Sequence, residues 1–302
     1  MRFAAGVALG LSTFLCGLFL LRGALRSFEG ELRPLLERRL TSPLRGAAVG
    51  ALAAALLQSS SAVNAVAVAL AGGGLLRLRQ AVSLILGANV GTTLTGQLAA
   101  FHPGPLGPAA FAAGAVLAFA GAGKLRRGGW ALAGLGGLLS GLDLMARALQ
   151  AGGTGAVHSL AGAGDGAALL TGALITALVQ SSSAVTATLV ALAEAGILAV
   201  RTAVAAVLGS NVGTVVTTLV AGFSSGPAGR RVAAVDLAFN ALGAALFLPL
   251  LPVLLSSAEA LSRSPGRQVA HAHTLFNLVT VALVLPFVDP LCAALERLLP
   301  KR

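Results

Sequence analysis

The chain has 302 residues, of which 56% are hydrophobic and only 10% are charged, and its mean hydropathy is +0.89. A soluble globular protein carries about 25% charged residues, so this composition excludes a soluble cytosolic enzyme and a disordered chain. Many stretches approach the roughly 20 apolar residues that a membrane-spanning helix requires. The composition therefore predicts an all-α, polytopic protein of the cell inner membrane.

The formal net charge of +11 comes from basic residues in the short breaks between apolar runs, such as Lys124 to Arg127 and the pair Arg230 and Arg231. In a soluble protein this charge would suggest a nucleic-acid partner. Here it follows the placement that orients membrane proteins, with positive loops on the cytoplasmic side. We therefore expect a lipid bilayer as the surroundings and no nucleic acid as a partner.

The N-terminal half begins with an apolar run at 3–21, which predicts a retained first membrane helix, and with a mixed stretch at 26–45, which predicts an interfacial helix. Two short apolar runs follow, at 46–57 and 62–76, separated by Gln58-Ser59-Ser60-Ser61. At about 1.5 Å per residue, neither run crosses a hydrocarbon core of about 30 Å. The polar tetrad therefore predicts a re-entrant hairpin or a broken helix.

The next run, at 81–101, is long enough to span but is interrupted by the Gly-, Asn- and Thr-containing segment 87–93, which predicts a second break. Further apolar runs predict membrane helices on both sides of a Gly-rich linker at 150–166. These runs are 109–123 and 130–149, joined by the basic turn at Lys124–Arg127, and then 232–255 and 269–285.

The polar motifs occur twice. Gln180-Ser181-Ser182-Ser183 repeats the first tetrad and Asn211-Val212-Gly213-Thr214 repeats Asn89-Val90-Gly91-Thr92, each 122 residues further on. An ungapped comparison of 56–96 with 178–218 gives 24 identities in 41 positions. This duplication predicts two repeats, each with a re-entrant helical hairpin and a broken helix.

The predicted organisation has five segments. These are a first membrane helix with an interfacial helix (1–45), repeat 1 (46–149), the linker (150–166), repeat 2 (167–290) and a C-terminal tail (291–302).

The duplicated breaks carry the chemistry of an ion-binding site. Broken helices in a bilayer persist only where they are buried in protein or line a cavity, and matched breaks in two halves indicate a transporter binding site. Serine favours helix N-termini, where free N–H groups attract anions. The three serines of each tetrad therefore predict an anion cradle, formed by Ser59, Ser60, Ser61, Ser181, Ser182 and Ser183.

The amide and hydroxyl side chains beside the serines offer neutral oxygen ligands to a hard cation such as Na⁺. A cation bound next to the anion lowers the cost of placing either charge in the bilayer. The predicted sodium ligands are Gln58, Gln180, Asn89, Thr92, Asn211 and Thr214, and the flanking glycines are expected to permit the turns. Small polar residues also serve as packing contacts between membrane helices, but the duplication favours a site.

Other polar residues are weaker candidates. Asp236 lies in an apolar run one turn before Asn240, so a role in the site stays open, whereas Glu194 is interpreted as a loop charge. His271 and His273 follow a basic loop, and a solvated or capping role is expected. No cofactor and no metal site beyond Na⁺ is predicted.

Both Gln-Ser-Ser-Ser tetrads, each followed by Gly-x-Asn-Val-Gly-Thr, resemble the type II sodium–phosphate cotransporter family, as does the segment 270–277. The resemblance covers about 46–286 and implies two inverted repeats with re-entrant hairpins. It further implies Na⁺-coupled symport of inorganic phosphate by alternating access. Position by position, it places the substrate and sodium residues on the two tetrads and on Asn89, Thr92, Asn211 and Thr214.

Three alternatives remain. The chain could transport another small anion or act in efflux, since a cradle without arginine recognises charge and shape loosely. An intramembrane serine hydrolase would need a base beside the serine, and neither repeat core contains His or Lys. A scaffold without transport is the third, and the oligomeric state, including a homodimer, stays open.

Overall fold

The computed structural model describes residues 42–100, 106–152 and 164–298, together with scattered positions in the first 40 residues. Every secondary-structure element described in this part of the chain is a helix, which confirms the all-α prediction. The predicted first membrane helix (3–21) and interfacial helix (26–45) lie largely outside the described residues, as does most of the linker (150–166).

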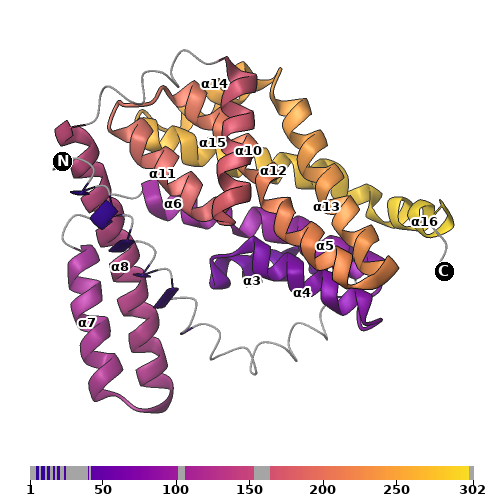
Figure 1. Ribbon diagram of the computed structural model, residues 1–302, viewed down its shortest axis with the longest axis horizontal. Helices are drawn as coiled ribbons and strands as arrows, with labels where there is room; N and C mark the ends of the chain where they lie inside the picture. The colour runs from indigo at the N-terminus through magenta and orange to yellow at the C-terminus, as the bar shows by residue number, and fades with distance from the viewer. Residues whose placement is uncertain are drawn as a thin grey trace.

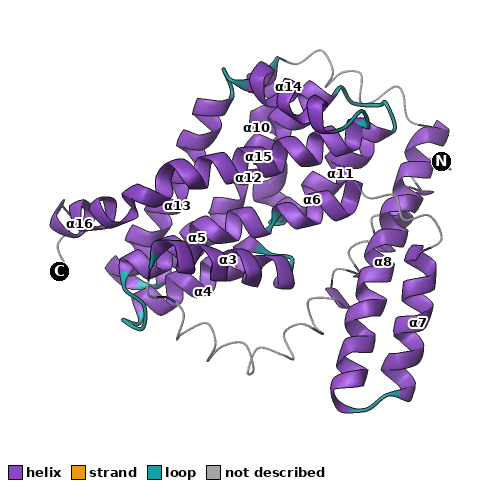
Figure 2. Cartoon of the chain, turned by 180° about the vertical axis from the view of Figure 1, so that it is seen from behind, coloured by secondary structure: helices purple, strands orange, loops and turns teal. Residues whose placement is uncertain are grey.

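The helices of the described chain follow one another as α3 (Pro43–Leu57), α4 (Ser60–Gly72), α5 (Leu78–Gly91), α6 (Thr93–Ala100), α7 (Leu106–Ala120), α8 (Gly123–Gly152), α10 (Asp165–Val179), α11 (Ser182–Glu194), α12 (Val200–Ser224), α13 (Gly226–Phe247), α14 (Leu251–Leu261), α15 (Pro265–Val284), η1 (Leu285–Phe287) and α16 (Val288–Leu298). Figures 1 and 2 show α7 and α8 side by side at one edge of the molecule. The remaining helices form one bundle in which α6 of the first half packs against α11 and α15 of the second.

Two helix pairs, α3 with α5 and α10 with α12, pack at very short range. An added Cβ at Gly87 on α5 would lie 1.8 Å from the carbonyl oxygen of Ala47, and one at Gly209 on α12 would lie 1.8 Å from the carbonyl oxygen of Leu169. Gly209 follows Gly87 by 122 residues, and Leu169 follows Ala47 by the same 122 residues. The sequence duplication therefore folds into a duplicated pair of packed helices, of the small-residue kind common in membranes.

Replacing Gly87 by valine is expected to destabilise the protein strongly, because the new side chain must push α3 away from α5. Overpacking in a well-packed site costs about 1–3 kcal/mol, and the obstacle here is backbone, which yields little. The matched control is Gly128→Ala on α8, where nothing lies within 4 Å of an added Cβ. Thermal unfolding of the detergent-purified protein measures the difference; an unchanged melting temperature for Gly87→Val would contradict the close packing.

The predicted breaks at the two Gly-x-Asn-Val-Gly-Thr motifs are mostly absent. In repeat 2 the prediction of a broken helix is wrong, because α12 runs through Asn211 without interruption. In repeat 1 only Thr92 separates α5 from α6, and it keeps right-handed backbone angles (φ −66°, ψ −20°). The glycines in these motifs allow close helix approach rather than a turn, so the backbone keeps its helical hydrogen bonds inside the apolar layer.

Among the described residues, α12 and the 33-residue stretch Pro265–Arg297 are long and apolar enough to cross a membrane. The predicted helix at 269–285 corresponds to α15 in that stretch. The single spanning helix predicted at 232–255 is wrong: α13 and α14 bend by 84° at the break between them. Pro249 lies in this break, and its ring and missing N–H end the preceding helix.

The turn between α7 and α8 also differs from the prediction. It lies at Gly121 and Ala122, so the basic residues Lys124 to Arg127 belong to the first turns of α8 rather than to the loop. Gly123 has φ +55°, a left-handed conformation that glycine adopts without strain, and this allows the chain to reverse just before those residues.

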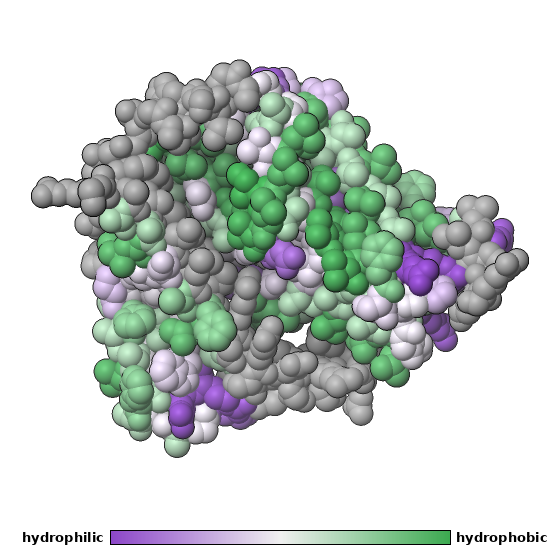
Figure 3. All heavy atoms as spheres, in the orientation of Figure 1, coloured by the Kyte–Doolittle hydropathy of each residue, from purple (hydrophilic) through white to green (hydrophobic). Residues whose placement is uncertain are grey.

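Hydrophobic side chains cover much of the face over α10 and α13 (Figure 3). On α10, the side chains of Leu170, Leu174 and Leu178 are 63%, 65% and 84% exposed. A soluble protein rarely exposes so many neighbouring leucines. Lipid tails solvate such a surface without cost, so the fold is that of a multi-pass membrane protein, as predicted.

Candidate functional site

Both Gln-Ser-Ser-Ser tetrads form a sharp break between two helices. Gln58 ends α3 and Gln180 ends α10, each in a left-handed backbone conformation (φ 51° and 54°). Within the described chain, these are the only non-glycine residues with positive φ. A left-handed side-chain-bearing residue costs about 1–3 kcal/mol and is retained mainly at functional sites. The strained positions therefore mark the same place in both repeats.

The first serine of each tetrad begins the second helix. The hydroxyl of Ser59 accepts a hydrogen bond from the backbone N–H of Ala62 (3.2 Å), and that of Ser181 accepts one from Ala184 (3.4 Å). These N-caps start α4 and α11 in the way that serine favours. The prediction that serines stand at helix starts is confirmed, although these two hydroxyls already serve their own helices.

The two repeats contact each other where Ser183 of the second tetrad reaches the helix break at Gln58 of the first. The hydroxyl of Ser183, in the first turn of α11, lies 3.4 Å from the backbone carbonyl oxygen of Gln58 and 3.4 Å from the hydroxyl of Thr92. Thr95 donates a hydrogen bond to the side-chain carbonyl of Gln58. The side chains of all four residues are nine-tenths or more buried. A serine of repeat 2 thus contacts the helix break of repeat 1, within a cluster of neutral oxygens.

The corresponding part of repeat 2 is arranged differently. Gln180 is exposed, whereas Gln58 is buried. The hydroxyl of Thr214 donates to the backbone carbonyl of Ser210 (2.9 Å), and Thr176 donates to the Ser210 side chain (2.8 Å). In the aligned positions of repeat 1 both Thr176 and Ser210 are replaced by alanine. The two halves therefore have unequal exposure and polarity around related motifs.

The two predicted asparagine ligands face the C-terminal helices. Asn211 is buried on α12, and its side-chain oxygen lies 3.3 Å from Nε2 of His273 on α15. Asn89 is buried on α5, where it donates to the carbonyl of Ile85 (3.3 Å) and interacts with Asp236 on α13. The structure brings Gln58, Thr92 and Ser183 together, and it gives each asparagine a titratable partner on α13 or α15.

Two sequence interpretations of polar residues are wrong. His273 is buried rather than solvated, because it lies on the face of α15 that packs against α12. Glu194 is the last residue of α11 and accepts hydrogen bonds from the Ser264 hydroxyl (2.6 Å) and the Gly266 backbone (2.8 Å). It therefore holds the N-terminus of α15 in place, where a carboxylate suits the helix dipole.

Thr95 and Asn64 are buried polar residues that the motif analysis missed. Thr95 is bonded to Gln58, and Asn64, in the second turn of α4, donates to Asp236 (3.2 Å). A signal for both is present in the repeat: Thr95 aligns with Thr217, and Asn64 aligns with another polar residue, Thr186. A search for positions outside the motifs that are polar in both repeats would have identified Thr95 and Asn64.

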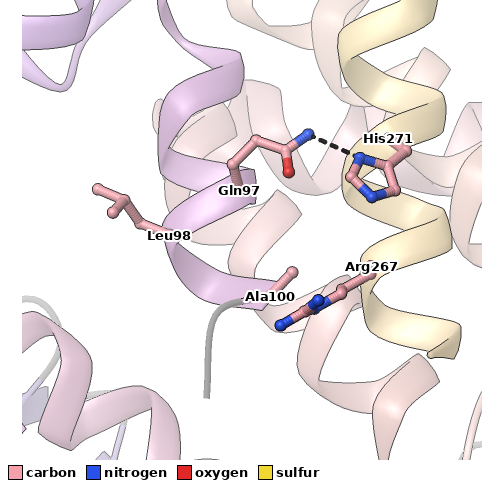
Figure 4. Close-up of a pocket in the computed structure, with 5 residues that line it drawn as sticks. All are labelled: Gln97, Leu98, Ala100, Arg267 and His271. Atoms are coloured by element: carbon pink, nitrogen blue, oxygen red, sulfur yellow. Dashed lines mark hydrogen bonds between the residues drawn. The ribbon is translucent and has the colours of Figure 1, made fainter. Parts of the chain in front are cut away.

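A pocket of about 370 Å³ opens between α6 and α15. Figure 4 shows Gln97 reaching across it toward His271, where the two side-chain nitrogens are 3.3 Å apart, while Arg267 lines the same opening. The guanidinium of Arg267 gives this lining a positive charge, which favours an anion. Gly96, next to Gln97, packs against Thr186 of α11, so the pocket lies beside the contact between the two halves.

Comparison with known proteins shows the family to which the chain belongs. A family model described as Na⁺/Pi-cotransporter matches residues 13–147 and 154–285. The protein YqeW of Bacillus subtilis (strain 168) is 32% identical over 257 residues, covering 83% of this chain and 84% of that protein. No solved structure matches the chain.

Two relatives have names that refer to phosphate. YjbB of Escherichia coli (strain K12), whose name proposes inorganic phosphate export, is 30% identical over 249 residues, covering 80% of this chain and 45% of that protein. The chain thus spans about half the length of this relative. Human sodium-dependent phosphate transport protein 2B is 32% identical over 90 residues, covering 29% of this chain and 13% of that protein.

An apolar helical bundle with a polar helix break in each half, matched over both halves by this family, defines a membrane transporter and not an enzyme. The chain belongs to the Na⁺/Pi-cotransporter family. The alternative of a serine hydrolase is therefore wrong, and two of the tetrad serines, Ser59 and Ser181, serve as helix N-caps.

Proposed function

We propose that the chain transports inorganic phosphate across the cell inner membrane together with Na⁺, as a symporter. The observation that carries this proposal is the meeting of Ser183 from repeat 2 with Gln58 and Thr92 from repeat 1. A site shared between two repeats can open to one side or to the other when the repeats move relative to each other. Membership of the Na⁺/Pi-cotransporter family supports the choice of phosphate and sodium.

Phosphate is proposed to bind at the starts of α4 and α11. Each first turn presents free backbone N–H groups at the positive end of the helix dipole. Ser60, Ser61, Ser182 and Ser183 can add hydroxyl donors, while Ser59 and Ser181 fix the helix starts through their caps. Because the cradle contains no charged side chain, a co-bound cation is needed to balance the anion in the apolar surroundings.

Sodium is proposed to bind to the neutral oxygens beside the cradle. In repeat 1 these are the carbonyl and amide oxygens of Gln58 with Asn89 and Thr92. In repeat 2 the corresponding ligands are Gln180, Asn211 and Thr214. Hard cations take oxygen ligands of this type, and the burial of Gln58 and Thr92 provides the dry environment in which ion pairing with phosphate is strong.

Alternating access is proposed to follow from the inverted relation of the repeats. Gln58 is buried and Gln180 is exposed, although the two residues have the same backbone conformation. A conformation with one half closed and the other open would produce this difference. In the opposite conformation the exposure of the two glutamines would be exchanged.

Reconstitution of the purified protein into liposomes tests the function. We expect radiolabelled phosphate to enter under an inward Na⁺ gradient and to enter poorly when K⁺ replaces Na⁺. Reversing the gradient should drive release, which covers the export direction in the name of the Escherichia coli relative. The anion selectivity is measured by adding sulfate or arsenate as a competitor of phosphate uptake. Phosphate entry that is equal in Na⁺ and K⁺ would contradict the proposal, as would preferential uptake of sulfate.

A further inference from the structure

Asp236 is a buried carboxylate in the middle of α13, with a side chain that is 1% exposed. Its two oxygens accept hydrogen bonds from the amide nitrogens of Asn64 (3.2 Å) on α4 and Asn240 (2.9 Å) on α13 itself. Thr218 on α12 and Asn89 on α5 also interact with the carboxylate. Four helices from both halves of the chain thus converge on one acidic group.

Within the part of the chain that the structure describes, the surroundings of this carboxylate lack a compensating charge. Every described side chain that interacts with Asp236 is a neutral amide or hydroxyl. A buried charge without a partner costs several kcal/mol, so proteins keep such a group only where a counter-ion or function accompanies it. A cation at this position would supply the missing charge.

Unpartnered oxygens are present for such a cation. Asn64 Oδ1 and Asn240 Oδ1 are both fully buried and have no hydrogen-bond partner in the described structure. Rotating a carboxamide by half a turn exchanges its oxygen and nitrogen positions without moving other atoms. The two asparagines can then direct their oxygens toward an ion that is held by the carboxylate.

We propose that Asp236, Asn64, Asn240 and Thr218 form a binding site for Na⁺, separate from the ligands assigned to the serine tetrads. A carboxylate with several neutral oxygens is the donor set that a hard cation takes. The inference rests on the proposed sodium coupling and adds a charged ligand to a machinery that otherwise has none. Since Asn89 also interacts with Asp236, the new site lies next to a proposed ligand of repeat 1.

Helix α15 offers a comparison with α13. His273 and Asn277 on α15 correspond to Asp236 and Asn240, both 37 residues further on and with the same Phe-Asn pair. His273 contacts Asn211 of repeat 2 as Asp236 interacts with Asn89 of repeat 1. An imidazole in place of the carboxylate cannot balance a cation by charge, so the proposed site belongs to Asp236 on α13 and has no counterpart at His273 on α15.

Equilibrium binding of radioactive sodium to the purified protein, in the absence of phosphate, tests the site. The variant is Asp236→Asn, which keeps the shape of the side chain and removes its charge. The matched control is Glu259→Gln, which removes one negative charge from an exposed position on α14. We expect Asp236→Asn to bind one Na⁺ fewer per chain than the wild type, and Glu259→Gln to bind the same number.

Thr218→Val provides a second variant in case the first does not fold, because it exchanges a hydroxyl for a methyl group of equal size. Loss of one neutral ligand should weaken sodium binding by about tenfold while leaving the number of sites unchanged. Equal stoichiometry and affinity in Asp236→Asn and the wild type would overturn the proposal, and this is also the result expected if Asp236 holds a proton instead. The measurement involves no phosphate, so it stands even if the transported anion is a different one.

Discussion

Replacing Gln58 by alanine is expected to impair Na⁺-driven phosphate transport strongly. The side-chain carbonyl of Gln58 accepts a hydrogen bond from Thr95, and its backbone carbonyl contacts Ser183 of the other repeat. Removing the side chain deletes a proposed sodium ligand and leaves the buried Thr95 hydroxyl unpaired. Such a loss costs about 1–3 kcal/mol, which corresponds to roughly 10- to 100-fold in binding.

The measurement is phosphate entry into proteoliposomes at several Na⁺ concentrations, together with thermal unfolding. Gln268→Ala serves as control, because that glutamine lies near the start of α15 and donates to the backbone carbonyl of Ser262 instead of contacting either tetrad. Gln180→Ala should also impair transport but should leave the melting temperature unchanged, since Gln180 is exposed in this conformation. Wild-type Na⁺ dependence in both Gln58→Ala and Gln180→Ala would refute their assignment as cation ligands.

Replacing Ser183 by alanine is expected to raise the phosphate KM by about tenfold, the effect of losing one hydrogen bond to a charged group. Ser183 is the hydroxyl that reaches across to the other repeat, so its loss should affect anion binding more than sodium activation. Transport measured against phosphate concentration at saturating Na⁺ gives the KM.

The matched variant is Ser181→Ala, two residues earlier in the same tetrad. Its hydroxyl caps α11, so its loss should lower stability by about 1 kcal/mol with a smaller change in KM. If Ser181→Ala raised KM as much as Ser183→Ala, the distinction between the capping serine and the binding serine would be wrong.

The duplication and its polar motifs were predictable because identical residues recur at one fixed offset. Residues at this offset also have the same structure. Gln58 and Gln180 both have a left-handed backbone conformation, and Gly87 and Gly209 both make a close helix contact. Serine at a helix start was predictable as well, since the preference depends only on the local backbone.

Features that depend on a neighbouring helix were not predictable. Glycine lowers helix propensity and also permits close helix packing, and only the position of Ala47 beside Gly87 shows that the second property applies here. Asn64 and Asp236 are 172 residues apart, so no local pattern connects them. His273 follows a basic loop in the sequence, but the packing of α15 against α12 buries it.

The structure of the protein with phosphate and Na⁺ bound tests the central claim most directly. The account predicts a tetrahedral anion between the first turns of α4 and α11, within hydrogen-bond distance of the Ser183 hydroxyl, with Na⁺ beside the Gln58 and Thr92 oxygens. Phosphate bound instead in the basic pocket of Gln97, Arg267 and His271, with the serine tetrads empty, would contradict it.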